Sequence, residues 1–248
     1  MIALGLSQPA DAIVYGYVST TTFGNPAIYN SIPTVGLTAA DVGKSFDTTW
    51  DLPASPSYGL STDLHGTGHF TIESFDQTNL VIKSTITNTT DSLFQAAVMS
   101  LALAVDPAAV GSFANPGDAG AIFTQIGTGS GPQQTYPGGL KNVDVCVYSS
   151  NGCSGGKISS GLLDGYSKTS TPSPNSDTFT LTLTSTATGG FGTSPSATLG
   201  ALGIKWQTQD GSFEMPATHV VPEPRTLLLF LIGFAGLIAC RRWKRTPS

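Results

Sequence analysis

The sequence is poor in charge, and what charge it has is unevenly placed. Charged residues make up 11% of 248 residues, well under the roughly 25% of an average soluble domain. Residues 13–221 contain no arginine, six lysines and 14 acidic residues, which gives this stretch a formal charge of −8. An acidic body without arginine lacks the basic footprint that contacts nucleic-acid phosphates, so we expect no nucleic-acid partner.

Helical periodicity is also lacking before residue 222, except that Thr38–Gly43 could form one turn. Five segments instead alternate apolar and polar residues with period two, which is typical of strands with one buried face. They are 80–86, 99–105, 143–147, 178–184 and 202–206. We therefore predict an all-β domain over residues 13–215, a single β-sandwich of about eight to twelve strands, with a jelly-roll as one candidate arrangement.

The N-terminal residues 1–12 are a short apolar run that ends in Ala10-Asp11-Ala12. Such a run resembles the last part of a secretory signal peptide, with cleavage after Ala12. The basic start of a signal peptide is missing, so we expect translation to begin upstream of Met1. An ordinary first strand is the alternative interpretation.

The C-terminal end has three consecutive features, which follow a short stalk predicted at 216–221. They are Pro222-Glu223-Pro224, an uncharged apolar segment at 226–240, and a basic tail at 241–245 that contains Arg241, Arg242, Lys244 and Arg245. A helix over the apolar segment would measure about 22 Å, against about 30 Å of hydrocarbon. Cations beside a membrane helix stay in the cytoplasm, which would leave the body on the outer side. A helix buried in the core is the alternative, and the four cations argue against it.

This order of features resembles a PEP-CTERM sorting signal. The resemblance implies recognition by an exosortase, a membrane-embedded cysteine protease or transpeptidase that cleaves near Pro222-Glu223-Pro224. It further implies a Gram-negative type bacterium with an exopolysaccharide matrix. We expect a protein of the cell surface or extracellular space, anchored transiently in the inner membrane with its C-terminus in the cytoplasm.

Of the three cysteines, Cys240 lies in the apolar segment, which leaves Cys146 and Cys153 in the body. In an exported protein, two cysteines seven residues apart indicate a disulfide; two free buried thiols are the alternative. Asn151-Gly152 lies between them, so we expect a hairpin tip in which Cys153 starts the return strand.

A second set of short motifs lies in the middle and last thirds of the body. They are Asn88-Thr89-Thr90, Asp106-Pro107, Val145-Cys146-Val147, Cys153-Ser154-Gly155-Gly156, Gly161, Gly165, 179–183 and Ile204-Lys205-Trp206-Gln207. Together they resemble the cistern family of PEP-CTERM proteins. This resemblance implies export and sorting, without a biochemical activity.

Residues that could perform chemistry are few. Asp63, His65 and His69 are the best metal candidate, but zinc needs three convergent ligands and no third histidine is near, so surface or hydrogen-bonded histidines are the preferred interpretation. Glu73 and Glu214 are the only glutamates of the body, and no Gly-x-Ser-x-Gly nucleophile motif occurs. We expect neither cofactor nor metal, and no enzymatic activity.

The sequence therefore favours an exported structural or interaction protein, with a role linked to exopolysaccharide or biofilm. A carbohydrate- or protein-binding module is the alternative, for which exposed tyrosines would form a platform. The candidates are Tyr58, Tyr136, Tyr148 and Tyr166. A secreted hydrolase is a third and less favoured class.

Overall fold

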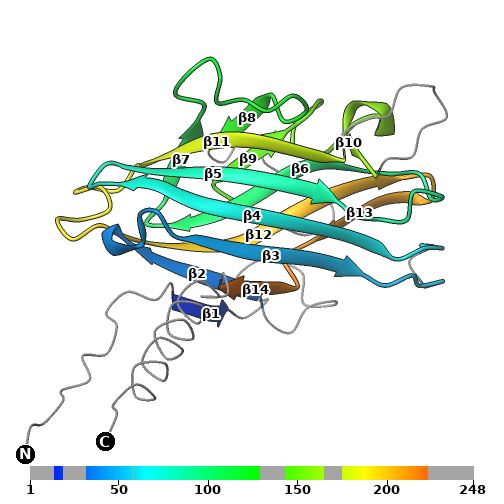
Figure 1. Ribbon diagram of the computed structural model, residues 1–248, viewed down its shortest axis with the longest axis horizontal. Helices are drawn as coiled ribbons and strands as arrows, with labels where there is room; N and C mark the ends of the chain where they lie inside the picture. The colour runs from blue at the N-terminus through cyan, green and yellow to red at the C-terminus, as the bar shows by residue number, and fades with distance from the viewer. Residues whose placement is uncertain (1–13, 19–31, 58, 129–142, 165–174, 223–248) are drawn as a thin grey trace, which may run out of the picture.

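The protein is built from two antiparallel β-sheets with almost no helix (Figure 1). The computed structural model describes residues 14–18, 32–57, 59–128, 143–164 and 175–222. Within these residues, no helix is long and apolar enough to cross a membrane. The predicted signal segment 1–12, the apolar segment 226–240 and the basic tail 241–245 lie outside them.

The first sheet, sheet A, follows the order β1-β2-β12-β6-β9-β8, with β10 paired to β6 and β13 paired to β12. Its longest strands, β6 and β12, are adjacent at its centre. The bounds are β1 Val14–Val18, β2 Ile32–Thr38, β6 Ala96–Asp106, β8 Gln125–Thr128, β9 Val145–Tyr148, β10 Leu162–Leu163, β12 Ser196–Thr208 and β13 Gly211–Met215.

The second sheet, sheet B, follows the order β14-β3-β4-β5-β11-β7. Its strands β3, β4 and β5 form a meander, and β14, the last strand, pairs with β3 at the edge of the sheet. The bounds are β3 Ser45–Leu52, β4 Leu64–Phe75, β5 Asn79–Asn88, β7 Ala109–Ser112, β11 Ser176–Ser185 and β14 His219–Pro222. The jelly-roll arrangement stays a prediction.

One hydrophobic core lies between the two sheets and receives side chains from both. The burial of β5 alternates along the strand, as its period-two sequence predicts. Phe46 and Phe70 stack with ring centroids 4.9 Å apart. The buried Trp50 of sheet B donates its indole N–H to the carbonyl of Leu202 in sheet A at 2.7 Å, which joins the two layers directly.

The prediction of one buried face is wrong for the strands at the centre of sheet A. All four residues of β9 are buried, and β6 and β12 are buried on both faces over most of their length. The second face is covered because Cys146 and Cys153 pack there with Ala102 and Tyr148 in a separate hydrophobic cluster. Small residues at alternate positions of β6 make room for this second layer.

The predicted stalk 216–221 is wrong as well, because most of it belongs to the folded body. His219–Pro222 form β14, which pairs with β3. Ala217 is buried in the core, and Val220 packs against it. Apolar residues and an unoccupied strand edge together draw this segment into the sheet. The one helical turn expected near Thr38 is present as a short 3-10 helix, η2, at Ala39–Asp41.

Candidate functional site

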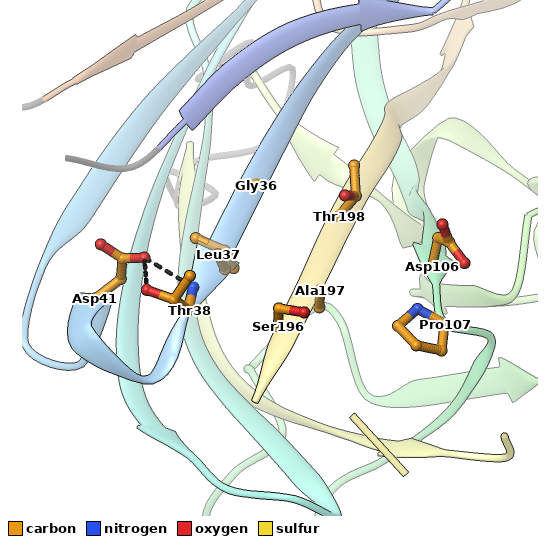
Figure 2. Close-up of a pocket in the computed structure, with 9 residues that line it drawn as sticks. All are labelled: Gly36, Leu37, Thr38, Asp41, Asp106, Pro107, Ser196, Ala197 and Thr198. Atoms are coloured by element: carbon orange, nitrogen blue, oxygen red, sulfur yellow. Dashed lines mark hydrogen bonds between the residues drawn. The ribbon is translucent and has the colours of Figure 1, made fainter. Parts of the chain in front are cut away.

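A hollow of about 420 Å³ opens at one end of sheet A (Figure 2). It lies where β2 passes into η2, β12 begins and β6 ends. Figure 2 shows Asp41 and Asp106 on opposite sides of the first residues of β12. The lining residues are Gly36, Leu37, Thr38, Asp41, Asp106, Pro107, Ser196, Ala197 and Thr198.

Asp41 holds one wall of the hollow in place. Its Oδ2 accepts hydrogen bonds from the backbone N–H and the hydroxyl of Thr38, at 2.8 and 2.9 Å. Its Oδ1 accepts a bond of 2.9 Å from the ammonium of Lys44. Burial acts to raise the pKa of Asp41, but the hydrogen bonds from Lys44 and Thr38 outweigh it and lower that pKa below its ordinary value. Asp41 is therefore ionised and structurally engaged.

The other wall carries Asp106, an exposed residue that lies opposite Thr198. Nearby Asp144 accepts a hydrogen bond of 2.8 Å from the backbone N–H of Val105. Burial raises the pKa of Asp144, the negative charge of Asp106 raises it further, and the Val105 hydrogen bond opposes both. Asp106 therefore adds an exposed carboxyl group to this wall of the hollow.

The hollow has a mixed lining, in which Thr38, Ser196 and Thr198 add hydroxyls to the carboxylates of Asp41 and Asp106, and Leu37, Pro107 and Ala197 are apolar. Hydroxyls both donate and accept hydrogen bonds, so they suit a neutral polar ligand such as a sugar. Sequence reasoning missed this hollow, because its residues come from three segments that are far apart in the chain.

The weak metal candidates Asp63, His65 and His69 have separate partners in the structure. His65 Nδ1 lies 2.8 Å from Asp51 Oδ1, and His69 Nδ1 lies 2.7 Å from Asp47 Oδ1, each across the β3–β4 ladder. The two histidines are four residues apart on one strand, about 13 Å at 3.3 Å per residue. Asp63 instead accepts the backbone N–H of Ala54 at 2.6 Å. In the part of the chain that the structure describes, no group of three or more His, Cys, Asp or Glu residues could hold a metal ion.

Cys146 and Cys153 form a buried disulfide with their Cα atoms 6.0 Å apart. Asn151 and Gly152 both have positive φ, as an Asn-Gly turn requires. The expected return strand at Cys153 is wrong, because the chain continues as a loop to the 3-10 helix η4 at Ile158–Ser160. The loop is held down where Ser100 donates its hydroxyl to the carbonyl of Cys153 at 3.1 Å.

Beneath the same loop lies a buried ion pair. Lys205 Nζ and Glu214 Oε1 are 2.9 Å apart on the neighbouring strands β12 and β13, and both side chains are almost fully buried. Gly155 has a φ of +97°, a conformation that favours glycine, and a Cβ added there would also lie 3.0 Å from the Lys205 side chain. Each charge offsets part of the desolvation free energy that the other would cost if it were buried alone.

The tyrosine platform receives no support from the described residues. Tyr148 is buried in the second hydrophobic cluster, next to the disulfide. Tyr58, Tyr136 and Tyr166 lie outside the described residues.

The sorting sequence begins inside the folded body. Pro222 is the last residue of β14 and lies opposite Phe46 of β3, whereas Glu223 and Pro224 lie outside the described residues. A family profile described as the PEP-CTERM protein-sorting motif matches residues 220–245. No curated protein and no solved structure matched the chain.

The match establishes what the C-terminal pattern predicts: the chain is a PEP-CTERM sorting domain-containing protein. The motif supports an exported, cell-surface protein of a Gram-negative type bacterium and implies exosortase-mediated processing. The resemblance to the cistern family is not tested by this match and stays a prediction.

Proposed function

We propose that this protein is a non-enzymatic component of the cell surface or extracellular matrix, delivered as a β-sandwich body by exosortase cleavage of its tail. Its role is structural or adhesive and is linked to the exopolysaccharide of a biofilm. The observation that carries the proposal is the sorting motif at 220–245, joined directly to a folded, disulfide-bonded body. A buried disulfide suits an oxidising compartment outside the cytoplasm.

Before cleavage, we propose that residues 226–240 form a membrane helix, with Arg241, Arg242, Lys244 and Arg245 on the cytoplasmic side. The support comes from the uncharged apolar run and the cluster of cations that follows it. The anchoring is transient, because cleavage near Pro222-Glu223-Pro224 separates the body from the helix.

A glycosidase mechanism that uses the two glutamates of the body is disfavoured by where these residues lie. Glycoside hydrolysis requires two carboxyl groups on either side of one bond, about 5 to 10 Å apart. Glu73 is exposed on β4 of sheet B, whereas Glu214 is buried on β13 of sheet A and paired with Lys205. The two glutamates of the body therefore cannot form one acid–base pair.

A carbohydrate-binding module is the second candidate, and the outward face of sheet B favours it. Hydroxyl groups lie in pairs across neighbouring strands of this face, and each keeps capacity for another hydrogen bond. The pairs are Thr85 and Thr178 at 2.8 Å, Thr87 and Ser176 at 3.0 Å, and Ser45 and Thr71 at 2.9 Å. Sedimentation of the purified body with insoluble exopolysaccharide from the host would test this candidate.

Fractionation of an exosortase-bearing host tests the leading proposal. Wild-type protein is expected in the extracellular or outer-surface fraction, and Glu223→Ala protein in the inner membrane with its tail intact. Glu73→Ala is the matched control, because it removes an exposed glutamate of the body and leaves the motif unchanged. Equal distribution of all three proteins would overturn the proposal.

A further inference from the structure

The sorting motif and the folded body share residues. The motif covers 220–245, and its first three residues are the last three of β14. Val221 lies opposite Asp47, and Pro222 lies opposite Phe46, near the start of β3. Figure 1 shows β14 beside β3 at the margin of sheet B. No spacer therefore separates the body from the sequence that the exosortase must engage.

Two kinds of contact hold β14 in place. The backbone N–H of Thr218 donates to the carbonyl of Thr49 at 2.7 Å, and the Thr218 hydroxyl accepts from the N–H of Asp51 at 2.9 Å. Ala217 is buried, and Val220 packs on the core. However, β14 has four residues and β3 is its one hydrogen-bonded neighbour in the sheet order. Short edge strands of this kind open locally at a small fraction of the cost of global unfolding.

The distance to the membrane segment is short. Three residues, Glu223, Pro224 and Arg225, separate the end of β14 from the apolar segment that starts at Thr226. Fully extended, they reach about 10 Å. A membrane-embedded protease that acts on this stretch must therefore approach to within about 10 Å of the edge of sheet B.

We propose that β14 gates its own processing: while it is paired with β3, the start of the sorting motif is shielded, and the exosortase acts on chains in which β14 has separated from β3. An extended peptide is commonly recognised by adding it as a strand to a sheet edge, through hydrogen bonds to its backbone groups. The body of sheet B occupies one side of β14 until the strand separates. This inference rests on the proposed exosortase processing and adds a conformational control to it.

A cross-strand disulfide tests the gate. Val221→Cys with Asp47→Cys joins β14 to β3 through two partly exposed residues that lie directly opposite each other, one position before Pro222. Directly opposed Cβ atoms lie about 4.5–5.5 Å apart, within reach of a disulfide after small adjustments. The matched control, Thr85→Cys with Thr178→Cys, joins β5 to β11 through an equally exposed hydroxyl pair and leaves β14 free.

The rate of tail loss is measured in vesicles that contain the exosortase, with and without reductant. The β14 lock is expected to slow processing about tenfold or more. Reductant should restore the rate to that of equally reduced wild type, and the control lock should be processed at the wild-type rate. Equal rates for both locked proteins would overturn the gate.

A variant that weakens the pairing of β14 with β3 provides an independent test if the locked protein does not accumulate. Val220→Asp places a charge against the core and weakens β14 pairing; it is expected to speed processing several-fold, and an unchanged rate would overturn the gate. Wild-type protein that stays uncleaved in the presence of exosortase would instead refute the processing proposal itself.

Discussion

Trp50 donates its indole N–H to the backbone carbonyl of Leu202, and this 2.7 Å bond crosses from one sheet to the other. Leu202 has a positive φ of 33° and lies where the register between β12 and β6 shifts, between Gly200 and Gly203. The irregularity leaves a carbonyl available for the indole in the middle of an apolar core. Two elements 152 residues apart in the chain are thereby fixed against each other.

Replacing Trp50 with phenylalanine is expected to lower the free energy of unfolding by about 2–4 kcal/mol. The change removes buried volume and leaves the Leu202 carbonyl without its indole donor. Urea denaturation followed by circular dichroism measures the loss, because this signal does not depend on tryptophan fluorescence.

Trp206→Phe is the matched control. Trp206 is also fully buried, but its indole nitrogen has no hydrogen-bond partner among the described residues. The same loss of volume therefore comes without a broken bond, and its cost is expected to be smaller by about 1 kcal/mol or more. An equal or larger loss at Trp206 would contradict the importance of the inter-sheet hydrogen bond.

Asp41→Asn is expected to cost about 1 kcal/mol at neutral pH, because it removes the charge that Lys44 and Thr38 stabilise. The pKa of Asp41 is lowered from 3.8 in the folded protein. Its contribution to stability is therefore complete above 3.8 and is lost as the pH falls through the lower folded value. Urea denaturation of both proteins between neutral and acid pH should show their difference narrowing below 3.8; a difference that stays constant with pH would contradict the assignment.

Asp144→Asn is expected to raise stability at neutral pH, whereas Asp41→Asn lowers it. Burial and then the charge of Asp106 raise the pKa of Asp144 above 3.8, so its ionised form is disfavoured in the folded protein. The destabilisation is absent below 3.8 and develops as the pH rises through the folded pKa. Asparagine keeps an acceptor for the Val105 N–H, so the variant is expected to gain stability at neutral pH by less than about 1 kcal/mol. A variant that is less stable than wild type at neutral pH would contradict this account.

Replacing both Cys146 and Cys153 with serine is expected to lower stability by roughly 2.5 kcal/mol, the chain-entropy value for so small a loop. Reductant should destabilise the wild-type protein by a similar amount and leave the double variant unchanged. Non-reducing peptide mapping of exported protein provides the direct chemical reading, and free thiols at both positions would contradict the disulfide.

The alternation of residues predicted much of sheet B, but not the second covered face of sheet A. In β5 and β11, threonines on one side and large apolar residues on the other reveal which face is buried. In β6, alternate positions hold alanine or serine, and small residues are compatible with either solvent or close packing. The structure shows that this face is covered, because Cys146 and Cys153 pack over it together with Ala102. That packing depends on tertiary structure and cannot be predicted from the alternation of residues along β6.

The hollow and β14 could not be predicted from the sequence either, because both depend on contacts between segments that are far apart in the chain. The hollow is formed by Thr38, Asp106 and Ser196, which the registers of β2, β6 and β12 bring to one end of sheet A. The segment 216–221 looks like a stalk because it is short and contains proline, yet the open edge of β3 gives it a partner. By contrast, the sorting motif was readable because it is defined by linear order alone.

Intact-mass measurement of the mature protein from an exosortase-bearing host tests the central claim most directly. Processing predicts a mass that lacks the apolar segment and the basic residues after it, with a new C-terminus near Pro222-Glu223-Pro224. A surface-exposed mature protein whose mass still includes Arg245 would contradict the account.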